Sequence, residues 1–190
     1  MATTSSAKRK TDIPAAKPPC AIHSSAIIAD KAQITGTHPV TIGQNTVLHP
    51  YARIRAEGGA VTIGRNCVVC EGAIVGTASE NGFDVVIEDY VTIETGAAVE
   101  AKTVGYGCEI GVKAVVGREA MIGQWCRIAA LEKVDNVVED FTVVFGDGAR
   151  REDVALREHE AIRDARAEGM EKGAALMRKL IPSAAAKWAG

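Results

Sequence analysis

The stretch VGYGCEIGVKAVVGREAMIGQWCRIA, residues 104–129, repeats itself every six residues. An aliphatic side chain opens each hexad, at Val104, Ile110, Val116, Ile122 and Ile128. Glycine follows the opener in four consecutive hexads, and the fifth position is small each time: Cys108, Ala114, Ala120 and Cys126. With 19 glycines in 190 residues, four hits at one position arise by chance in roughly one case in ten thousand. The sequence therefore contains a hexapeptide repeat.

The same frame continues on both sides of this stretch, in groups of three hexads. The earlier openers are Ile22, Ile28, Ile34, Ile42, Leu48, Ile54, Ile63, Val69, Val75, Ile87, Ile93 and Val99. After Ile128 the pattern fades, and it returns at Val138 and Val144. Each group of three hexads predicts one turn of a triangular coil.

The hexad has a physical explanation in short strands joined by turns. The small fifth residue and the next opener lie two apart, so both point inward from one strand. In residues 91–105, for example, we expect Ile93, Ala97, Val99 and Thr103 to point inward. Asn45 and Asn66 lie in the middle of hexads, where a turn needs a residue that tolerates left-handed backbone. Coils stacked about 4.8 Å apart predict a mainly β solenoid of about seven coils.

The repeat resembles the hexapeptide left-handed β-helix family over residues 21–149. The left-handed crossover is implied by that resemblance, because parallel strand crossovers are in general right-handed. The predicted organisation is a flexible N-terminal arm at 1–19, a β-helix at 20–149, a C-terminal helical segment at 150–182 and a tail at 183–190.

From Glu152 to Leu180 the periodicity becomes that of an amphipathic helix. Its predicted packing face consists of Ile162, Ala165, Met170, Gly173, Met177 and Leu180. Gly169 and Gly173 each cost an isolated helix about 1 kcal/mol, so the helix needs a surface. We expect it to lie on the flank or the last coil of the β-helix. The alternative is a free helix that binds a partner.

Composition excludes several functions. The 22 Lys and Arg against 24 Asp and Glu leave no basic excess for nucleic-acid phosphates or anionic lipid. No apolar run reaches the ~18–20 residues of a membrane span. The first residues lack the apolar region of a secretory signal, and five cysteines are then expected to be reduced thiols. We expect a cytoplasmic protein.

Two enzyme classes share this architecture, the γ-class carbonic anhydrases and the acyltransferases that use acyl-CoA. Both need histidine, as zinc ligands or as a general base. In the γ-carbonic-anhydrase pattern the three ligand positions fall on Gly76, Thr95 and Glu100, which cannot provide nitrogen ligands for tetrahedral zinc. We therefore expect no catalytic, cofactor or metal site.

The remaining histidines and the cysteines have structural explanations. His49 is expected to point outward at a coil corner, where it is solvated or hydrogen-bonded. Cys67 and Cys70 have CxxC spacing, but the hexad frame places Cys67 inward and Cys70 outward, so they cannot share a metal. Cys67, Cys108 and Cys126 occupy the small inward position, where a free thiol packs as a small hydrophobe.

Residues 40–75, VTIGQNTVLHPYARIRAEGGAVTIGRNCVVCEGAIV, resemble the dynactin subunit 6 family, a β-helix family of the dynactin pointed-end complex. VIEDYVTIETGAAVEA (86–101), VGREAMIGQWCRIAALEKV (116–134) and LMRKLIP (176–182) follow in the family's order. The departures are a short loop at 76–84 and the ending SAAAKWAG. The dynactin subunit 5 family is the nearest rival and fits less well at LHPYARI and at the tail.

The resemblance implies a non-enzymatic structural subunit that supports dynein–dynactin transport along microtubules and attachment of cargo such as endosomes. Its implied partners are dynactin subunit 5, through β-helix contacts, dynactin subunit 4, the pointed-end actin-related protein and, through the complex, cytoplasmic dynein. No nucleic acid and no membrane insertion are implied. The interface candidates are Tyr51, Arg53, Arg55, Glu80, Asn81 and Phe83. A γ-carbonic-anhydrase-like or acyltransferase enzyme is the alternative.

Overall fold

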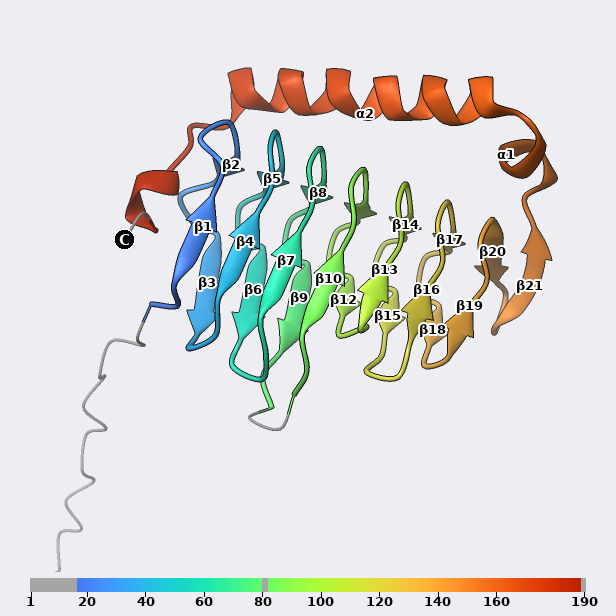
Figure 1. Cartoon of the computed structure of the whole chain (residues 1–190), viewed down its shortest axis with the longest axis horizontal. Helices are drawn as coiled ribbons and strands as arrows, with labels where there is room; N and C mark the ends of the chain where they lie inside the picture. Colours follow the sequence, from blue (N-terminus) through green and yellow to red (C-terminus); the bar gives the residue numbers. More distant parts are fainter. Residues whose placement is uncertain (1–16, 80–81, 189–190) are drawn as a thin grey trace, which may run out of the picture.

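The computed structural model describes residues 17–79 and 82–188, and it is a left-handed parallel β-helix with a C-terminal helix along its flank (Figure 1). The predicted fold class is confirmed. The predicted arm at 1–19 lies outside the described residues except for residues 17–19, and the interface candidates Glu80 and Asn81 lie outside them as well.

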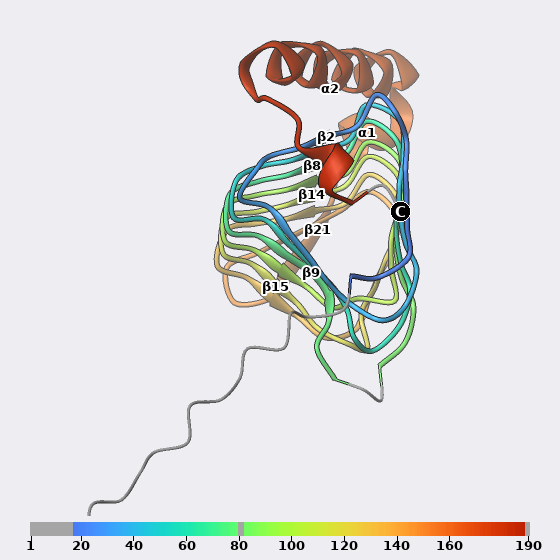
Figure 2. The same ribbon diagram turned by 90° about the vertical axis from the view of Figure 1, so that its left-hand side faces the viewer.

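Three parallel sheets form the sides of the prism (Figure 2). Sheet A consists of β1 (Cys20–Ile22), β4 (Val40–Ile42), β7 (Val61–Ile63), β10 (Val85–Ile87), β13 (Thr103–Val104), β16 (Met121–Ile122) and β19 (Val137–Val138). Sheet B consists of β2 (Ile27–Ile28), β5 (Val47–Leu48), β8 (Val68–Val69), β11 (Thr92–Ile93), β14 (Glu109–Ile110), β17 (Arg127–Ile128), β20 (Thr142–Phe145) and the antiparallel β21 (Ala149–Glu152). Sheet C consists of β3 (Gln33–Gly36), β6 (Arg53–Ala56), β9 (Ile74–Thr77), β12 (Ala98–Val99), β15 (Val115–Val116) and β18 (Lys133–Val134).

The hexad openers stack in three columns, one for each sheet. Ile28 pairs with Leu48, for example, and Ile54 pairs with Val75. All the predicted openers from Ile28 to Val144 are buried. Sheet C has six strands, so the stack has six complete coils and a seventh that keeps only two strands, where about seven were predicted.

One inward residue was predicted wrongly. Thr103 is half-buried on the outer side of β13, where it pairs with Met121, and Ala101 is fully buried instead. The openers Val99 and Val104 are separated by five residues, so this hexad is one residue short. The shortened corner changes which residue before Val104 points inward.

Left-handed backbone recurs at two of the three corners. At the corner between sheets A and B, φ is positive at Asn45, Asn66, Tyr90, Gly107, Trp125 and Phe141. At the corner between sheets B and C it is positive at Tyr51, Gly72, Gly96, Lys113 and Leu131. The turn role predicted for Asn45 and Asn66 is confirmed. The aromatic residues in these turns were not expected, since bulky side chains rarely adopt this conformation.

The C-terminal segment contains α1 (Val154–Glu158) and α2 (Glu160–Leu180). Helix α2 runs back along the whole stack (Figures 1 and 2). Its 21 residues span about 31 Å at 1.5 Å per residue, which matches six coils at about 4.8 Å each. Ala174, Met177 and Ile181 pack on Ile27 and Val47 of sheet B. The helix therefore packs within its own chain, on the flank of the β-helix.

The predicted packing face of α2 is confirmed only in part, at Met170, Gly173 and Met177, which are half-buried. Ile162, Ala165 and Leu180 are not buried, and Ala174 is the buried residue of the helix. The apolar residues of the charged first half are too few to define a face, so the ion pairs described below decide how the helix is rotated.

The helix contains no apolar stretch long enough to cross a membrane, and neither does any other helix in the described part of the chain.

The predicted tail, as far as residue 188, covers the first coil. Ser183 forms a bridge with Ala29, and the Ala184 N–H donates to the Ile28 carbonyl at 2.7 Å. A 3₁₀ turn, η1 (Ala185–Lys187), follows. Ala185 and Trp188 then pack against the core of the β-helix. The C-terminal segment thus closes the end of the stack at which the β-helix begins.

Candidate functional site

The three positions at which an enzymatic relative would hold zinc are not brought together as a ligand set. Gly76 and Glu100 occupy the same position of adjacent coils, because Val75 pairs with Val99 in sheet C. Thr95 lies in the turn between β11 and β12, at another corner, and is exposed. A Cβ added at Gly76 would lie 2.1 Å from the Arg55 carbonyl oxygen, so the backbone itself excludes a side chain there. Within residues 17–79 and 82–188, no cluster of three His, Cys, Asp or Glu side chains could hold a metal ion.

His49 differs from its expected environment. It lies at the corner after β5 and is half-buried, and its Nε2 is buried with no hydrogen-bond partner among the described residues. Burial lowers its pKa, while the nearby Glu71 and Glu94 carboxylates act in the opposite direction. The expectation of a solvated or hydrogen-bonded ring is therefore wrong for this nitrogen. Burial thus favours the neutral form of His49, and its buried Nε2 has no partner among the described residues with which to exchange a proton.

The inward thiols form a ladder of hydrogen bonds between coils that the sequence did not predict. The Cys67 Sγ donates to the Glu88 carbonyl at 3.0 Å, and the Cys108 Sγ donates to the Gly123 carbonyl at 2.9 Å. The Cys126 Sγ donates to the Glu139 carbonyl at 3.0 Å. Thr46 occupies the same position in an earlier coil and donates to the Gly64 carbonyl at 2.6 Å. Each donor satisfies a corner carbonyl of the next coil.

Three of the thiols, Cys67, Cys70 and Cys108, are poor nucleophiles, whereas the hydrogen bond with Cys108 lowers the pKa of Cys126. Burial raises the pKa of Cys67 to about 12 and the pKa of Cys108 well above its ordinary value. Cys70 is only half-buried, and burial together with the neighbouring Glu94 raises its pKa to about 12. Thiolate is the reactive form of cysteine, so these three thiols are held in their unreactive state. Cys67 is buried and Cys70 lies outside the core, as the hexad frame predicted, and both are free thiols.

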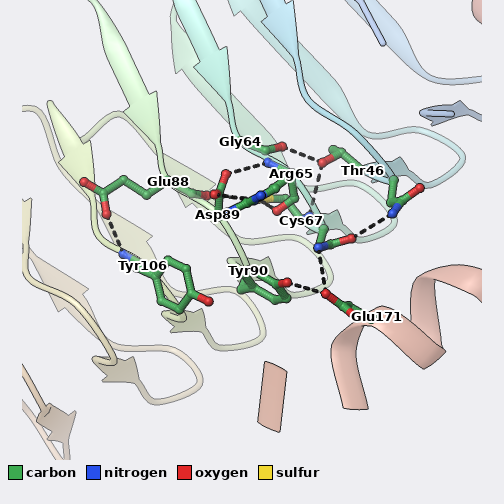
Figure 3. A network of polar contacts seen from close by, with 11 residues as sticks. Thr46, Gly64, Arg65, Cys67, Glu88, Asp89, Tyr90, Tyr106 and Glu171 are labelled. Carbon is green, nitrogen blue, oxygen red and sulfur yellow. Dashed lines mark hydrogen bonds and ion pairs between the residues drawn. The ribbon is translucent and has the colours of Figure 1, made fainter. Parts of the chain in front are cut away.

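A polar network joins adjacent coils at the corner between sheets A and B (Figure 3). Asp89 Oδ1 accepts the Arg65 N–H at 2.8 Å, and Asp89 Oδ2 accepts from the Arg65 side chain. A Cβ at Gly64 would lie 2.4 Å from Asp89 Oδ1. Gly64 therefore leaves the space that the Asp89 carboxylate needs to cap the corner of the preceding coil.

The same corner carries a stack of aromatic rings beneath α2. The Tyr90 and Tyr106 rings are 5.1 Å apart, and the Tyr106 and Trp125 rings are 5.2 Å apart. The Tyr90 hydroxyl donates to Glu171 of α2. Arg166 of α2 pairs with Glu109 at 2.8 Å, and Arg178 donates to Asn45. Polar side chains spaced along the whole helix thus attach α2 to this corner.

The described interface candidates surround the outer face of sheet C in the first coils. Tyr51 is exposed in the turn before β6, and its hydroxyl accepts from the Lys31 ammonium at 2.8 Å. Arg53 and Arg55 lie on β6, with Arg53 exposed and Arg55 half-buried. Phe83 packs against the core at the opposite corner of sheet C. The structure thus places these four residues along one side of the prism.

No protein-family model matches the chain. The chain is 30% identical over 141 residues to dynactin subunit 6 of Xenopus tropicalis, covering 68% of this chain and 69% of that protein. It is also 30% identical to dynactin subunit 6 of Nematostella vectensis, covering 76% of that protein. A 30% match to the bifunctional protein GlmU of Thermodesulfovibrio yellowstonii covers only 23% of that protein.

Solved structures with the same fold include enzymes. A hexapeptide transferase family protein from Anaplasma phagocytophilum has a TM-score of 0.68 at 19% identity, over 86% of this chain and 96% of that one. A mutant of AntD, an N-acyltransferase from Bacillus cereus solved with dTDP and coenzyme A, has a TM-score of 0.61 at 15% identity, over 81% and 91% of the two chains. At such identities the likeness shows the fold alone.

Proposed function

The chain belongs to the dynactin subunit 6 family, and from that membership we propose that it is a non-catalytic structural subunit of the dynactin pointed-end complex. In this role it acts in the cytoplasm and at the cytoskeleton, and it supports dynein–dynactin transport along microtubules and the attachment of cargo such as endosomes. Its direct partners are dynactin subunit 5, dynactin subunit 4 and the pointed-end actin-related protein. Cytoplasmic dynein is reached through the complex.

The observation that carries this proposal is a match spanning more than two thirds of two curated relatives, combined with the residues at the ligand positions. Gly76, Thr95 and Glu100 supply no imidazole, and the backbone leaves no room for one at position 76. The buried thiols bind carbonyls of the next coil. In this chain the thiols therefore serve to hold adjacent coils together.

The charged face of sheet C supports a further part of the proposal. Tyr51, Arg53 and Arg55 lie on a rigid side of the prism, where their positions are fixed by the strand ladder. Arginine and tyrosine are enriched at interface hot spots. Together with Phe83 and the loop at 76–84, which includes Glu80 and Asn81, they are proposed to contact a neighbouring subunit of the complex through this side.

The alternative is an enzyme, a hexapeptide acyltransferase or a γ-carbonic-anhydrase-like protein. Two measurements on the purified chain separate the alternatives from the proposal. Metal analysis is expected to find no stoichiometric zinc, and titration calorimetry with acetyl-CoA is expected to show no binding. Zinc at one equivalent per chain, or saturable acetyl-CoA binding, would overturn the non-catalytic role.

The direct test is identification of the proteins that co-purify with the chain from an extract of its own cells. The proposal predicts dynactin subunits 4 and 5 and the actin-related protein, recovered together. Recovery of the chain free of any dynactin subunit would contradict it. A variant with histidine restored at the three ligand positions (Gly76→His, Thr95→His and Glu100→His) cannot serve as a zinc-binding control, because Gly76 lacks room for any side chain.

A further inference from the structure

We infer that α2 pairs in antiparallel orientation with α2 of a second copy of this chain, through a face that does not contact the β-helix. This inference goes beyond the proposed function, because it uses the flank of the prism rather than an end of the stack. We call this face the outer face of α2 and define it by Ile162, Gly169, Gly173, Leu176 and Leu180. The argument combines exposed aliphatic side chains, two glycines, and a self-complementary order of residues along the helix.

The side of α2 that faces the β-helix is fixed by its contacts. Ala174 and Met177 pack on sheet B, and Arg166 and Glu171 contact the corner between sheets A and B. At 3.6 residues per turn these four positions span about 140° of the helix circumference. The outer face covers about 60°, and its centre is turned about 130° from the middle of that range. Helix α2 stands outside the prism (Figure 2), so a second helix can reach the outer face from solvent.

Three large aliphatic side chains of the outer face are exposed to solvent. The exposed fractions are 43% for Ile162, 52% for Leu176 and 65% for Leu180. They lie on one side of the helix, because Leu176 and Leu180 follow Ile162 by about four and about five turns. A single exposed aliphatic side chain is ordinary, but a column of them along one side of a helix indicates a contact made outside the chain.

Two glycines lie between these side chains on the outer face. Glycine destabilises a helix relative to alanine, so its presence in the middle of α2 needs a reason. A Cβ added at Gly169 or Gly173 would meet no atom within 4 Å, so packing within the chain does not require glycine at either position. The distance between two packed helices depends on the side chains at their contact. Glycines at the crossing point allow a second helix to approach closely.

The outer face is symmetric along the chain about position 171. Ile162 and Leu180 lie equally far on either side of this position, and so do Gly169 and Gly173. In a two-fold interface, residue i of one copy contacts residue j of the other, and j contacts i. An antiparallel pair centred at position 171 therefore places Ile162 against Leu180 of the second copy twice, with the glycines at the crossing.

The charges on α2 favour the same orientation. Exposed carboxylates lie in its first half, at Glu160, Asp164 and Glu168, and exposed lysines lie in its second half, at Lys172 and Lys179. An antiparallel pair brings the acidic half of each copy beside the lysines of the other, whereas a parallel pair brings like charges together. The ion pair between Glu168 and Lys172 within one helix, at 2.6 Å, is largely exposed. Such a pair contributes little and can be exchanged for one between the copies.

A second copy fits these features better than an unrelated helix, because one face supplies both halves of the complementarity. Helix α2 has 21 residues and spans about 31 Å. A contact between one pair of such helices lies at the small end of protein interfaces, below about 1,200 Å². The dimer is therefore transient: it forms at high concentrations of the chain and dissociates at low micromolar concentrations.

The test measures the molar mass of the full chain by light scattering from about 1 to 500 µM. The mass is expected to rise from the 19.9 kDa of one chain toward about twice that value. Leu176→Gln is expected to weaken the dimer about tenfold or more, because each interface loses two leucines. The matched control is Val115→Gln, which replaces an exposed aliphatic side chain on sheet C and is expected to change the dissociation constant less than about twofold.

A glycine variant separates a lost contact from a lost fold. Gly169→Gln is expected to raise the melting temperature, because glutamine is the better helix former. It is also expected to weaken the dimer about tenfold, because the new side chain separates the two helix axes. A mass of one chain at every concentration, equal weakening in Leu176→Gln and Val115→Gln, or an unchanged dimer in Gly169→Gln would overturn the inference.

The orientation is tested by cross-linking. Diamide is expected to join Ile162→Cys chains to Leu180→Cys chains in a mixture of the two, with the unsubstituted chain as the control for its own thiols. Cross-linking of Ile162→Cys chains alone, as fast as in the mixture, would show a parallel pair and overturn the antiparallel one. The proposed function is tested by the proteins that co-purify with the chain, so it stands whichever way these measurements fall.

Discussion

At the scale of single residues, the buried thiols are structural donors. Cys67, Cys108 and Cys126 each donate to a carbonyl at a corner of the next coil. Leaving such a carbonyl unsatisfied costs about 1–3 kcal/mol. Val91 occupies the equivalent position in the coil between Cys67 and Cys108 and supplies no donor, so the ladder is interrupted once.

Substitution of Cys67 tests this role with side chains of nearly equal volume. Thr46 makes the same bond one coil earlier, so Cys67→Thr is expected to retain the hydrogen bond to Glu88 and lose less than about 1 kcal/mol. Valine has the same shape as threonine but no hydrogen-bond donor, so Cys67→Val is expected to lose about 1–3 kcal/mol of unfolding free energy. The measurement is the free energy of unfolding in urea for both variants. Equal losses would show that packing alone selects cysteine.

The pH dependence of stability provides a second test of the same thiol. Burial raises the Cys67 pKa from 9.0 to about 12, so the folded state retains a proton that the unfolded chain releases. The contribution is fully present below pH 9 and is lost as pH rises from 9 to 12. The urea midpoint is therefore expected to fall over this window, and to fall less in Cys67→Thr. An identical pH dependence in both proteins would contradict the assignment.

At the scale of elements, α2 is attached to the β-helix mainly by polar contacts. Its apolar packing on Ile27 and Val47 is made by Ala174, Met177 and the following Ile181, near its C-terminal end. Along the rest of its length the contacts are ion pairs and hydrogen bonds to the corner between sheets A and B, at Glu109 and Tyr90. The N-terminal half of α2 is consequently expected to be the less stable half.

Tyr90→Phe measures how much one of these polar contacts contributes. The variant retains the ring beside Tyr106 and removes the bond to Glu171, so unfolding free energy is expected to fall by about 1 kcal/mol. Tyr106→Phe is the matched control, because within the described residues its hydroxyl makes no hydrogen bond, and a change near zero is expected. A larger loss in Tyr106→Phe than in Tyr90→Phe would contradict this attachment.

The last described residues act as a cover for the first coil. Removal of residues 183–190 takes away the partners of Ile28 and the Trp188 ring from the core. Hydrogen exchange at the amides of residues 27–34 is expected to accelerate strongly, while exchange at residues 104–128 stays unchanged, because each coil contacts only its neighbours. Uniform acceleration along the chain, or none, would show that the segment has no local role.

At the scale of the whole molecule, the features set by the hexapeptide repeat could be predicted from the sequence. The features set by contacts between residues far apart in the sequence could not. The three buried columns follow from the period, because each opener from Ile28 onward stacks on the one in the next coil. The deviation at Thr103 followed from a corner shortened by one residue. Such local changes of register leave the rest of the frame intact.

Other features could not be predicted from the period. The rotation of α2 depends on ion pairs such as Arg166 with Glu109, which lie 57 residues apart in the sequence. The cover at 183–188 depends on Ile28, which lies 155 residues before Ser183. For the thiol ladder a signal was present, since Thr46, Cys67, Cys108 and Cys126 share one inward position and all can donate a hydrogen bond.

The central claim is that this β-helix serves as a binding surface for a second one, and the most direct measurement is the molar mass of its complex. The purified chain and dynactin subunit 5 are mixed and analysed by size exclusion with light scattering. The account predicts one species whose mass is the sum of one copy of each, including the 19.9 kDa of this chain. Two separate peaks, or a homotrimer of this chain with subunit 5 left unbound, would contradict it.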